Sequence, residues 1–206
     1  QQVNHILGRN TSNNTATQLL IDGNLTTDKR KISNSFNKYF TTVANDLSKK
    51  IPKTNNVFQD YLKNPNQHSI FLNETTPHEI SLVIRSLKDS KAADIFGITT
   101  KFVKYANPAI TSNLSVIFNK SLEEGIFPQI FKLAKVIALF KTASPLKVSN
   151  YRPISLLPIF SKIFERLIYN RLVTFITENK ILSELQFGFQ KNKSTEQAVT
   201  SIISAL

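Results

Sequence analysis

The segment at residues 135–156 limits the possible folds of this chain more than any other. An apolar run of strand length ends at Lys141, turn-forming residues follow, and a second extended piece contains Arg152. Pro153 restricts Arg152 to the extended region of backbone space. The sequence therefore predicts a β hairpin that places Lys141 and Arg152 near one another. Two fixed cations that face a cleft suit a polyphosphate.

Helical periodicity dominates the rest of the chain. Apolar residues recur at helical spacing, with capping boxes at Thr76 and Ser194 and a stop at Gly125. Residues 1–30 are polar and aperiodic, which predicts a loop or tail with a turn at 21–24. The predicted class is mainly α with a small β hairpin (α+β), and its helices are expected at 33–50 (loosely attached), 76–88, 99–105, 108–124, 158–180 and 194–206.

Composition excludes several classes of protein. The chain has 206 residues, 41% of them hydrophobic, so it can bury a sizeable core. It has no cysteine and three scattered histidines, which argues against disulfides and a structural metal. No apolar run reaches the roughly 18–20 residues of a membrane span, and no signal peptide pattern occurs. We therefore expect a soluble, intracellular protein that does not bind membranes.

The positive charge of the chain favours a polyanionic partner. Lysine and arginine number 26 against 14 acidic residues, which gives a net charge of +12. Residues 132–193 hold eleven of these cations and three glutamates, hence +8 of the total. This concentration indicates nucleic acid binding. The alternative is a solvated surface that serves only solubility.

Several short motifs lie in a fixed order along the second half of the chain. They are Ser149-Asn150-Tyr151-Arg152-Pro153-Ile154-Ser155-Leu156, Ser161-Lys162-Ile163-Phe164-Glu165, Asn170-Arg171-Leu172, Gln186-Phe187-Gly188-Phe189 and Ser194-Thr195. In order and spacing this series resembles the fingers region of non-LTR retrotransposon reverse transcriptases, the jockey-like group above all. The resemblance implies the fingers of a right-hand polymerase.

The resemblance implies a nucleotide-binding role for Lys141 and Arg152. They match the family positions whose side chains meet the triphosphate of the incoming nucleotide. Cations there neutralise phosphate oxygens, and arginine adds bidentate geometry. In the alternative reading, Arg152 caps carbonyl groups of the hairpin.

The resemblance also implies a template-binding set. On the helix at 158–180 we expect a cationic face, and the bend that follows contacts the template in the family. The expected template-binding residues are Lys162, Arg166, Arg171, Gln186, Phe187, Gly188, Phe189, Lys191 and Lys193. The alternatives are a solvated helix face and aromatic side chains that only fill the core.

The chain departs from the family pattern at two places. Asp94 and Phe96 stand where the family has a glycine and an aspartate, although the Asp94 side chain can still order the turn. Gln190 and Asn192 replace an arginine and a glycine, which weakens the expected phosphate contact and leaves Lys191 and Lys193 as substitutes.

The carboxylates of a polymerase active site are not expected in this chain. Nucleotidyl transfer uses two divalent metals held by carboxylates, yet the last aspartate is Asp94. We assign no catalytic residue and no metal ligand, and we expect the fragment alone to be inactive. The family's palm aspartates, with their Mg²⁺, would follow the C-terminus. The expected organisation is a tail at 1–30, a helix and linker at 31–75, and fingers at 76–206, truncated before the palm.

The predicted function is that of a fragment of an RNA-directed DNA polymerase. Its implied partners are an RNA template, a DNA primer, deoxynucleoside triphosphates, and the palm and upstream endonuclease of the same polyprotein, and the family implies the nucleus. One alternative is a non-catalytic or degenerate nucleic acid-binding module. Another is a helical domain whose basic faces bind acidic protein. Without a palm, the helices at 158–180 and 194–206 are expected to expose apolar surface.

Overall fold

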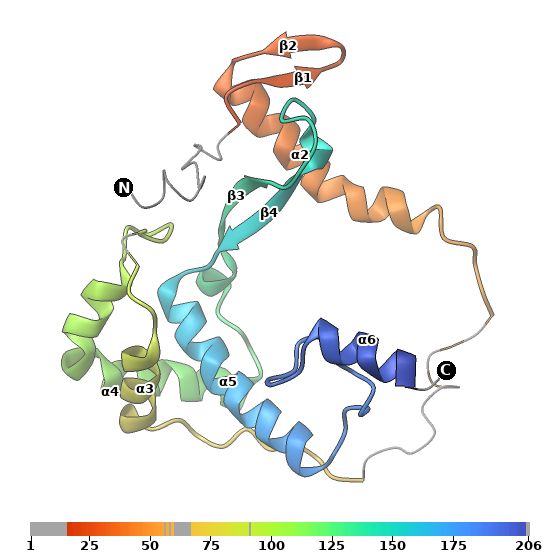
Figure 1. The fold of residues 1–206 in the computed structure, drawn as a ribbon. Helices are drawn as coiled ribbons and strands as arrows, with labels where there is room; N and C mark the ends of the chain where they lie inside the picture. The colour runs from red at the N-terminus through yellow and green to blue at the C-terminus, as the bar shows by residue number, and fades with distance from the viewer. Residues whose placement is uncertain (1–15, 56, 58, 60–66, 91, 205–206) are drawn as a thin grey trace, which may run out of the picture. The chain divides into compact units, whose positions relative to one another are not determined.

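The computed structural model describes residues 16–55, 57, 59, 67–90 and 92–204. They form α-helices and two antiparallel hairpins (Figure 1). Their contacts divide them into two compact units. We call the first the hairpin unit; it comprises the described residues up to 55 together with 92–99 and 129–158. The remaining residues form the helical unit. The predicted class is confirmed as mostly helical with small β elements.

The predicted hairpin is present and forms the centre of the hairpin unit. Strand β3 (Lys135–Phe140) pairs antiparallel with β4 (Tyr151–Leu156). The ladder extends one residue further, because the Lys141 N–H donates to the Asn150 carbonyl at 2.8 Å. Hydrogen-bonded pairs alternate in such a ladder, so Pro153 falls at a non-hydrogen-bonded position. Its missing N–H therefore costs the sheet no bond.

Helix α2 (Lys29–Ser48) packs on one face of this hairpin. The Asp28 carboxylate caps its first turn by accepting hydrogen bonds from the backbone N–H groups of Arg30 and Lys31. The Phe36 ring meets the buried Tyr151 ring edge-on, with centroids 4.9 Å apart. The Tyr151 hydroxyl donates to the Pro145 carbonyl at 2.8 Å. The expectation of a loosely attached helix is wrong, because Phe36 is part of the core of the unit.

A second hairpin precedes α2. Strands β1 (Leu19–Ile21) and β2 (Asn24–Thr26) pair antiparallel, so the expectation of loop or tail is wrong from Leu19 onward. The predicted turn is confirmed: Asp22 and Gly23 connect the strands, both with positive φ, as a two-residue hairpin turn requires. The sequence did not reveal these strands because each has only three residues, too few to show an alternating pattern, and polar residues flank them. Residues 1–15 of the expected tail lie outside the described residues.

Four helices of the described residues build the helical unit. They are α3 (Pro77–Ser86), α4 (Thr100–Glu124), α5 (Ile159–Glu178) and α6 (Thr195–Ser204). Phe118 of α4 stacks on Phe164 of α5 with ring centroids 4.6 Å apart, and Phe127 stacks on the same ring at 5.4 Å. Both Phe118 and Phe164 are fully buried. The core of the unit therefore lies where α3 and α4 contact α5.

Helix α4 corrects the expectation of two helices at 99–105 and 108–124. It is one helix with Pro108 in its interior. Proline removes one hydrogen bond of a helix but does not end it when packing holds both sides. The buried Asn107, next to Pro108, donates to the Ser81 hydroxyl of α3 at 2.9 Å. The predicted stop is confirmed, since Gly125 follows the last turn with a φ of 65°.

The loop before α4 is ordered by an aspartate, as predicted. The Asp94 carboxylate accepts the N–H groups of Phe96 and Ile98 at 2.9 and 3.0 Å, and Gly97 adopts a φ of 76°. An aspartate side chain thus closes the turn on its own backbone.

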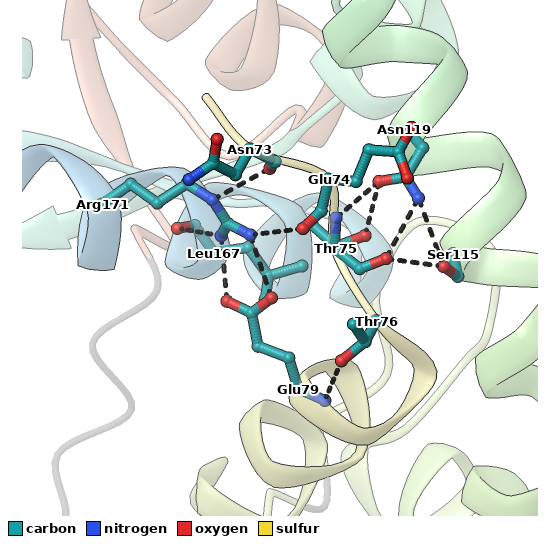
Figure 2. Close-up of polar contacts among 9 residues, drawn as sticks. All are labelled: Asn73, Glu74, Thr75, Thr76, Glu79, Ser115, Asn119, Leu167 and Arg171. Carbon is teal, nitrogen blue, oxygen red and sulfur yellow. Dashed lines mark hydrogen bonds and ion pairs between the residues drawn. The ribbon is translucent and has the colours of Figure 1, made fainter. Parts of the chain in front are cut away.

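The guanidinium of Arg171 joins α5 to α3 and to the segment before α3 (Figure 2). It forms a bidentate pair with Glu79, both distances being 2.9 Å. Its other bonds go to the carbonyls of Asn73, Glu74 and Leu167, each at 3.1 Å. A guanidinium has five N–H donors, and here all five have an acceptor. We call this arrangement the Arg171 fork.

The residue after Glu74 continues the same network toward α4 (Figure 2). The Asn119 side chain accepts from the Thr75 N–H at 2.7 Å and donates to the Thr75 carbonyl at 3.0 Å. The Ser115 hydroxyl donates to that carbonyl at 2.8 Å. Thr75 is buried, so these bonds satisfy backbone groups that water cannot reach.

The last helix confirms two expectations. Its capping box is confirmed, because Ser194 and Gln197 exchange hydrogen bonds between side chain and backbone. Its apolar residues Val199, Ile202 and Ile203 are all more than half exposed. The expected apolar surface on this helix is therefore present.

Changing Arg171 to lysine tests the fork. Arg171→Lys keeps the charge but offers three donors in a geometry that cannot match two carboxylate oxygens. We expect the free energy of unfolding to fall by roughly 1.5–3 kcal/mol, measured by urea denaturation. Arg85→Lys, on the exposed side of α3, is the matched control and should change little. Equal losses in the two variants would contradict the role of the fork.

Tyr151 makes the stability of the hairpin unit depend on pH. Burial raises the pKa of Tyr151 above its usual 10.0. The Tyr151 hydroxyl therefore ionises at a lower pH in the unfolded chain than in the folded one. As the pH rises above about 10, this difference favours the unfolded chain, so the free energy of unfolding falls. Tyr151→Phe should cost about 1 kcal/mol near neutrality through the lost bond to Pro145. In urea denaturation, the difference between the two proteins should stay constant up to about pH 9 and shrink above about pH 10. A constant difference would refute this coupling.

Candidate nucleic acid interface

Lys141 and Arg152 lie on one face of the β3–β4 hairpin. Arg152 is opposite Leu139, and Lys141 is two residues beyond Leu139, so both side chains leave the sheet on the same side. Diagonal neighbours of this kind have Cα atoms roughly 7–8 Å apart. Both residues are exposed. The structure therefore brings together the two residues predicted to bind nucleotide.

The other face of the hairpin is closed by α2. Phe140 and Tyr151, which alternate with Lys141 and Arg152, pack against Phe36. The two cations therefore lie on a strand pair whose opposite face is packed against α2. No hydrogen bond or ion pair joins the Arg152 side chain to another described residue. No ion pair between described residues includes Lys141 or Arg152, so both cations can contact one polyanionic group.

The cationic face expected on α5 needs a correction. Lys162 and Arg166 are exposed and four residues apart, hence on one side of the helix. Arg171 lies nine residues after Lys162, which is two and a half turns, so it points to the opposite side. There it forms the fork, with 16% of its side chain exposed. Helical spacing alone separates these residues, but only the structure identifies the acceptors of Arg171.

Tyr169 is a member of the exposed face of α5 that the sequence analysis missed. The Arg166 guanidinium lies over its ring, 5.3 Å from the centroid. Together with Lys162, Glu165 and Leu87, these residues line an open hollow of about 470 Å³. The spacing of Lys162, Arg166 and Tyr169, at i, i+4 and i+7, is the signal that predicts this grouping.

The two phenylalanines of the bend at 186–193 differ in exposure. Phe187 is half-buried, and the Lys193 ammonium lies 5.0 Å from its ring centroid. Phe189 is fully exposed and has a φ of 60°. Positive φ is strained for a bulky residue. The backbone here thus projects an aromatic ring into solvent instead of placing it in the core.

The remaining predicted residues of the bend are also accessible. Gln186, Gly188 and Lys191 are exposed. Gly188 has neither a positive φ nor any protein atom within 4 Å of the position that a Cβ would take. No residue in the described part of this chain therefore approaches Gly188 closely. Lys193 donates to the Glu184 carbonyl at 2.6 Å, so its ammonium is partly used within the bend.

The two predicted sets belong to different units. Lys141 and Arg152 are part of the hairpin unit, whereas α5 and the bend are part of the helical unit.

The described residues do not fit a divalent metal. They contain no cluster of three or more histidine, aspartate or glutamate side chains that could hold one. No step of nucleotide chemistry is therefore assigned to a metal on these residues. None of the described helices combines the length and apolarity needed to cross a bilayer.

Comparison with known proteins places the sequence among mobile-element polymerases. It is 34% identical over 147 residues to the RNA-directed DNA polymerase from mobile element jockey of Drosophila melanogaster. It is 36% identical over 141 residues to a probable RNA-directed DNA polymerase from transposon BS of the same species. The jockey polymerase of Drosophila funebris is 30% identical over 144 residues. The three matches cover 71%, 68% and 69% of this chain.

No family model matches the chain. It spans 16% of the length of each of these relatives. These relatives belong to the group of proteins that the motif series resembles. Over the stretch that it covers, the chain belongs to the jockey-like non-LTR retrotransposon reverse transcriptases.

Proposed function

We propose that this chain forms the fingers of an RNA-directed DNA polymerase and holds the incoming nucleotide and the template. The observation that carries the proposal is the pair of exposed cations, Lys141 and Arg152, on one face of a hairpin whose other face is packed. A preorganised cation pair stabilises phosphate charge without rearranging during the reaction. Catalysis itself is assigned to a palm outside residues 1–206.

The template-binding part of the proposal rests on the helical unit. Its contacts are Lys162 and Arg166 on α5 with Gln186, Phe187, Gly188, Phe189, Lys191 and Lys193 in the bend. Arg171 is left out of this set because its five donors are used in the fork. Exposed aromatic rings among cations are the usual means of binding single strands, since bases stack on the rings while cations contact phosphates.

The relatives supply the context of the proposal. Three of them are named as RNA-directed DNA polymerases of mobile elements. We assign to the parent protein of this chain an RNA template, a DNA primer, deoxynucleoside triphosphates, Mg²⁺ in its palm and action in the nucleus. Residues 1–30 and 31–75 would then connect an upstream endonuclease of the same polyprotein to the fingers at 76–206.

A second candidate function is a nucleic acid-binding module without polymerase activity. The departures from the family pattern at Asp94, Phe96, Gln190 and Asn192 favour it. The ordered Asp94 turn weakens the first half of this argument, because that loop keeps a closed conformation despite its altered sequence.

Arg152 tests the nucleotide-binding role. In the complete parent enzyme, Arg152→Ala should lower the polymerisation rate at limiting nucleotide by roughly 10²–10³-fold. Template affinity should change little. Arg152→Lys should recover part of the rate, because lysine restores charge but not bidentate geometry. Steady-state kinetics with varied nucleotide and a template-binding assay separate the two effects. Unchanged nucleotide kinetics in Arg152→Ala would remove this role, and Arg85→Ala serves as the control.

Phe189 tests the template-binding role. The chain contains no tryptophan, so Phe189→Trp introduces a single fluorescent reporter. We expect a single-stranded RNA oligonucleotide to quench it by stacking, whereas an abasic strand of equal charge should bind without quenching. Phe189→Ala should weaken binding by about 1–3 kcal/mol, the usual contribution of one stacked base.

Tyr105→Trp provides the matched control for this reporter. Tyr105 is 88% exposed on α4, outside the proposed contact set. Its tryptophan should keep its fluorescence when RNA binds. If the RNA binds, as measured by anisotropy of a labelled strand, and leaves the tryptophan at 189 unquenched, then Phe189 does not stack on a base.

A further inference from the structure

Helix α2 has a cationic outer face that neither the hairpin core nor the proposed polymerase contacts use. Ile32 and Phe36 mark the side that packs on the hairpin. Lys38 follows Lys31 by seven residues, and Lys49 follows Lys38 by eleven. These intervals are close to two and three helical turns, so the three lysines form one row. All three are exposed.

The row lies on the side of α2 turned away from the hairpin. Lys38 follows the buried Phe36 by two residues, hence by about 200° around the helix. The residues between the lysines of the row are polar and acid-free: Asn34, Thr42 and Asn45. We call these six residues the α2 outer face.

No ion pair between described residues accounts for the cations of this face. None of the ion pairs between described residues includes Lys31, Lys38 or Lys49. Asp46 is the single carboxylate inside α2, against four basic residues from Lys29 to Lys38.

Helix stability explains one of the three lysines and not the other two. The first turn of α2 has no acidic residue and begins with Lys29, Arg30 and Lys31, while the last turn has no basic residue. The partial positive charge at a helix N-terminus repels cations, so Lys31 stands at the less favourable end of α2, although the Asp28 carboxylate caps that end. Lys49, the C-cap residue, stands at the favourable end. The charges of Lys31 and Lys38 therefore have no role in the stability of α2, which points to an external partner.

The chemistry of the face selects the class of partner. The lysines are spaced by roughly 10 and 16 Å along the axis, which suits a long polyanion better than a single phosphate group. Asparagine and threonine side chains supply donors and acceptors for phosphate and sugar oxygens. A membrane-binding helix would need an apolar stripe at the surface, and the outer face has none.

The face is separate from the nucleotide-binding pair. α2 covers the hairpin side that carries Phe140 and Tyr151, whereas Lys141 and Arg152 leave the other side. The outer face of α2 therefore lies beyond the helix, on the far side of the hairpin unit from these cations. We propose that the α2 outer face binds the sugar–phosphate backbone of a nucleic acid at a second position, distinct from the template contacts and the nucleotide contacts.

The test replaces the charges of the row in the full chain. The triple variant Lys31→Gln, Lys38→Gln, Lys49→Gln keeps helix propensity, since glutamine and lysine are similar helix formers. The control triple is Lys88→Gln, Lys101→Gln, Lys180→Gln, whose lysines are exposed on the helical unit and belong to no proposed contact. Both variants lose the same charge, so long-range electrostatics alone affects them equally.

The readout is the salt dependence of affinity for single-stranded RNA, single-stranded DNA and duplex RNA. We expect the α2 triple to reduce the slope of log affinity against log salt by about 2–3 for the nucleic acid that occupies the face. The control triple should reduce it by less than about one. A preference among the three probes identifies the form of nucleic acid. Equal slopes for the two triples with all three probes would overturn the proposal.

Two further measurements separate this proposal from the proposed function and from a protein partner. Arg152→Gln should not change the contribution of the α2 outer face to the salt dependence of nucleic acid affinity. A failure of the nucleotide-binding role of Arg152 can therefore be distinguished from a failure of the α2 proposal. A poly-glutamate peptide tests an acidic protein: if the α2 triple loses affinity for this peptide but not for any nucleic acid, the proposal is wrong. Lys31→Gln should also raise the Tm slightly, because it removes a cation from the helix N-terminus. A lower Tm would contradict the electrostatic argument.

Discussion

The helical unit depends on one side chain whose hydrogen-bonding capacity is completely used. Arg171 reaches from α5 to the carboxylate at the start of α3 and to two carbonyls of the segment before it. That segment also carries Thr75, whose buried backbone groups bond to α4. A chain with little regular structure between residues 67 and 76 is thus fixed to three helices by polar contacts. The stacked rings of Phe118 and Phe164 complete the core between two of those helices.

The fork also separates structural cations from cations that remain available. Arg171 is a basic residue in a motif shared with polymerases, yet its donors are directed inward. Lys141, Arg152, Lys162 and Arg166 are exposed on elements that the cores of the two units hold in place. The cations behind the net charge of +12 are therefore not all equally available at the surface. Burial and pairing decide which of the cations can meet an external anion.

Exposure and strain coincide at the bend after α5. Phe189 combines full exposure with a positive φ, while Phe187, two residues earlier, lies under a lysine ammonium. Backbone strain persists where surrounding structure holds it, and it often marks a functional position. The apolar residues of α6 are exposed as well, which gives the C-terminal part of the helical unit an uncovered surface. Such surfaces commonly mark sites of interaction with another protein segment.

Local sequence signals predicted the β3–β4 hairpin, the capping boxes at Thr76 and Ser194, the stop at Gly125 and the Asp94 turn. Each signal depends on residues within a few positions of one another, so the chain carries it wherever it folds. The same locality explains the errors. The strands of the β1–β2 hairpin are too short to show a periodic pattern. Pro108 resembles a helix boundary, although packing on both sides keeps α4 continuous.

For the candidate site, the sequence determined which residues are basic or aromatic and that Lys141 and Arg152 share a hairpin. The tertiary structure decided which of them are used internally. The acceptors of Arg171 at Asn73 and Glu74 lie 98 and 97 residues away in the chain. Helical spacing shows which residues share a face, but burial of that face depends on distant segments. Hydrogen bonds of this kind form only when packing brings such segments together, and this is why they cannot be inferred from neighbouring residues.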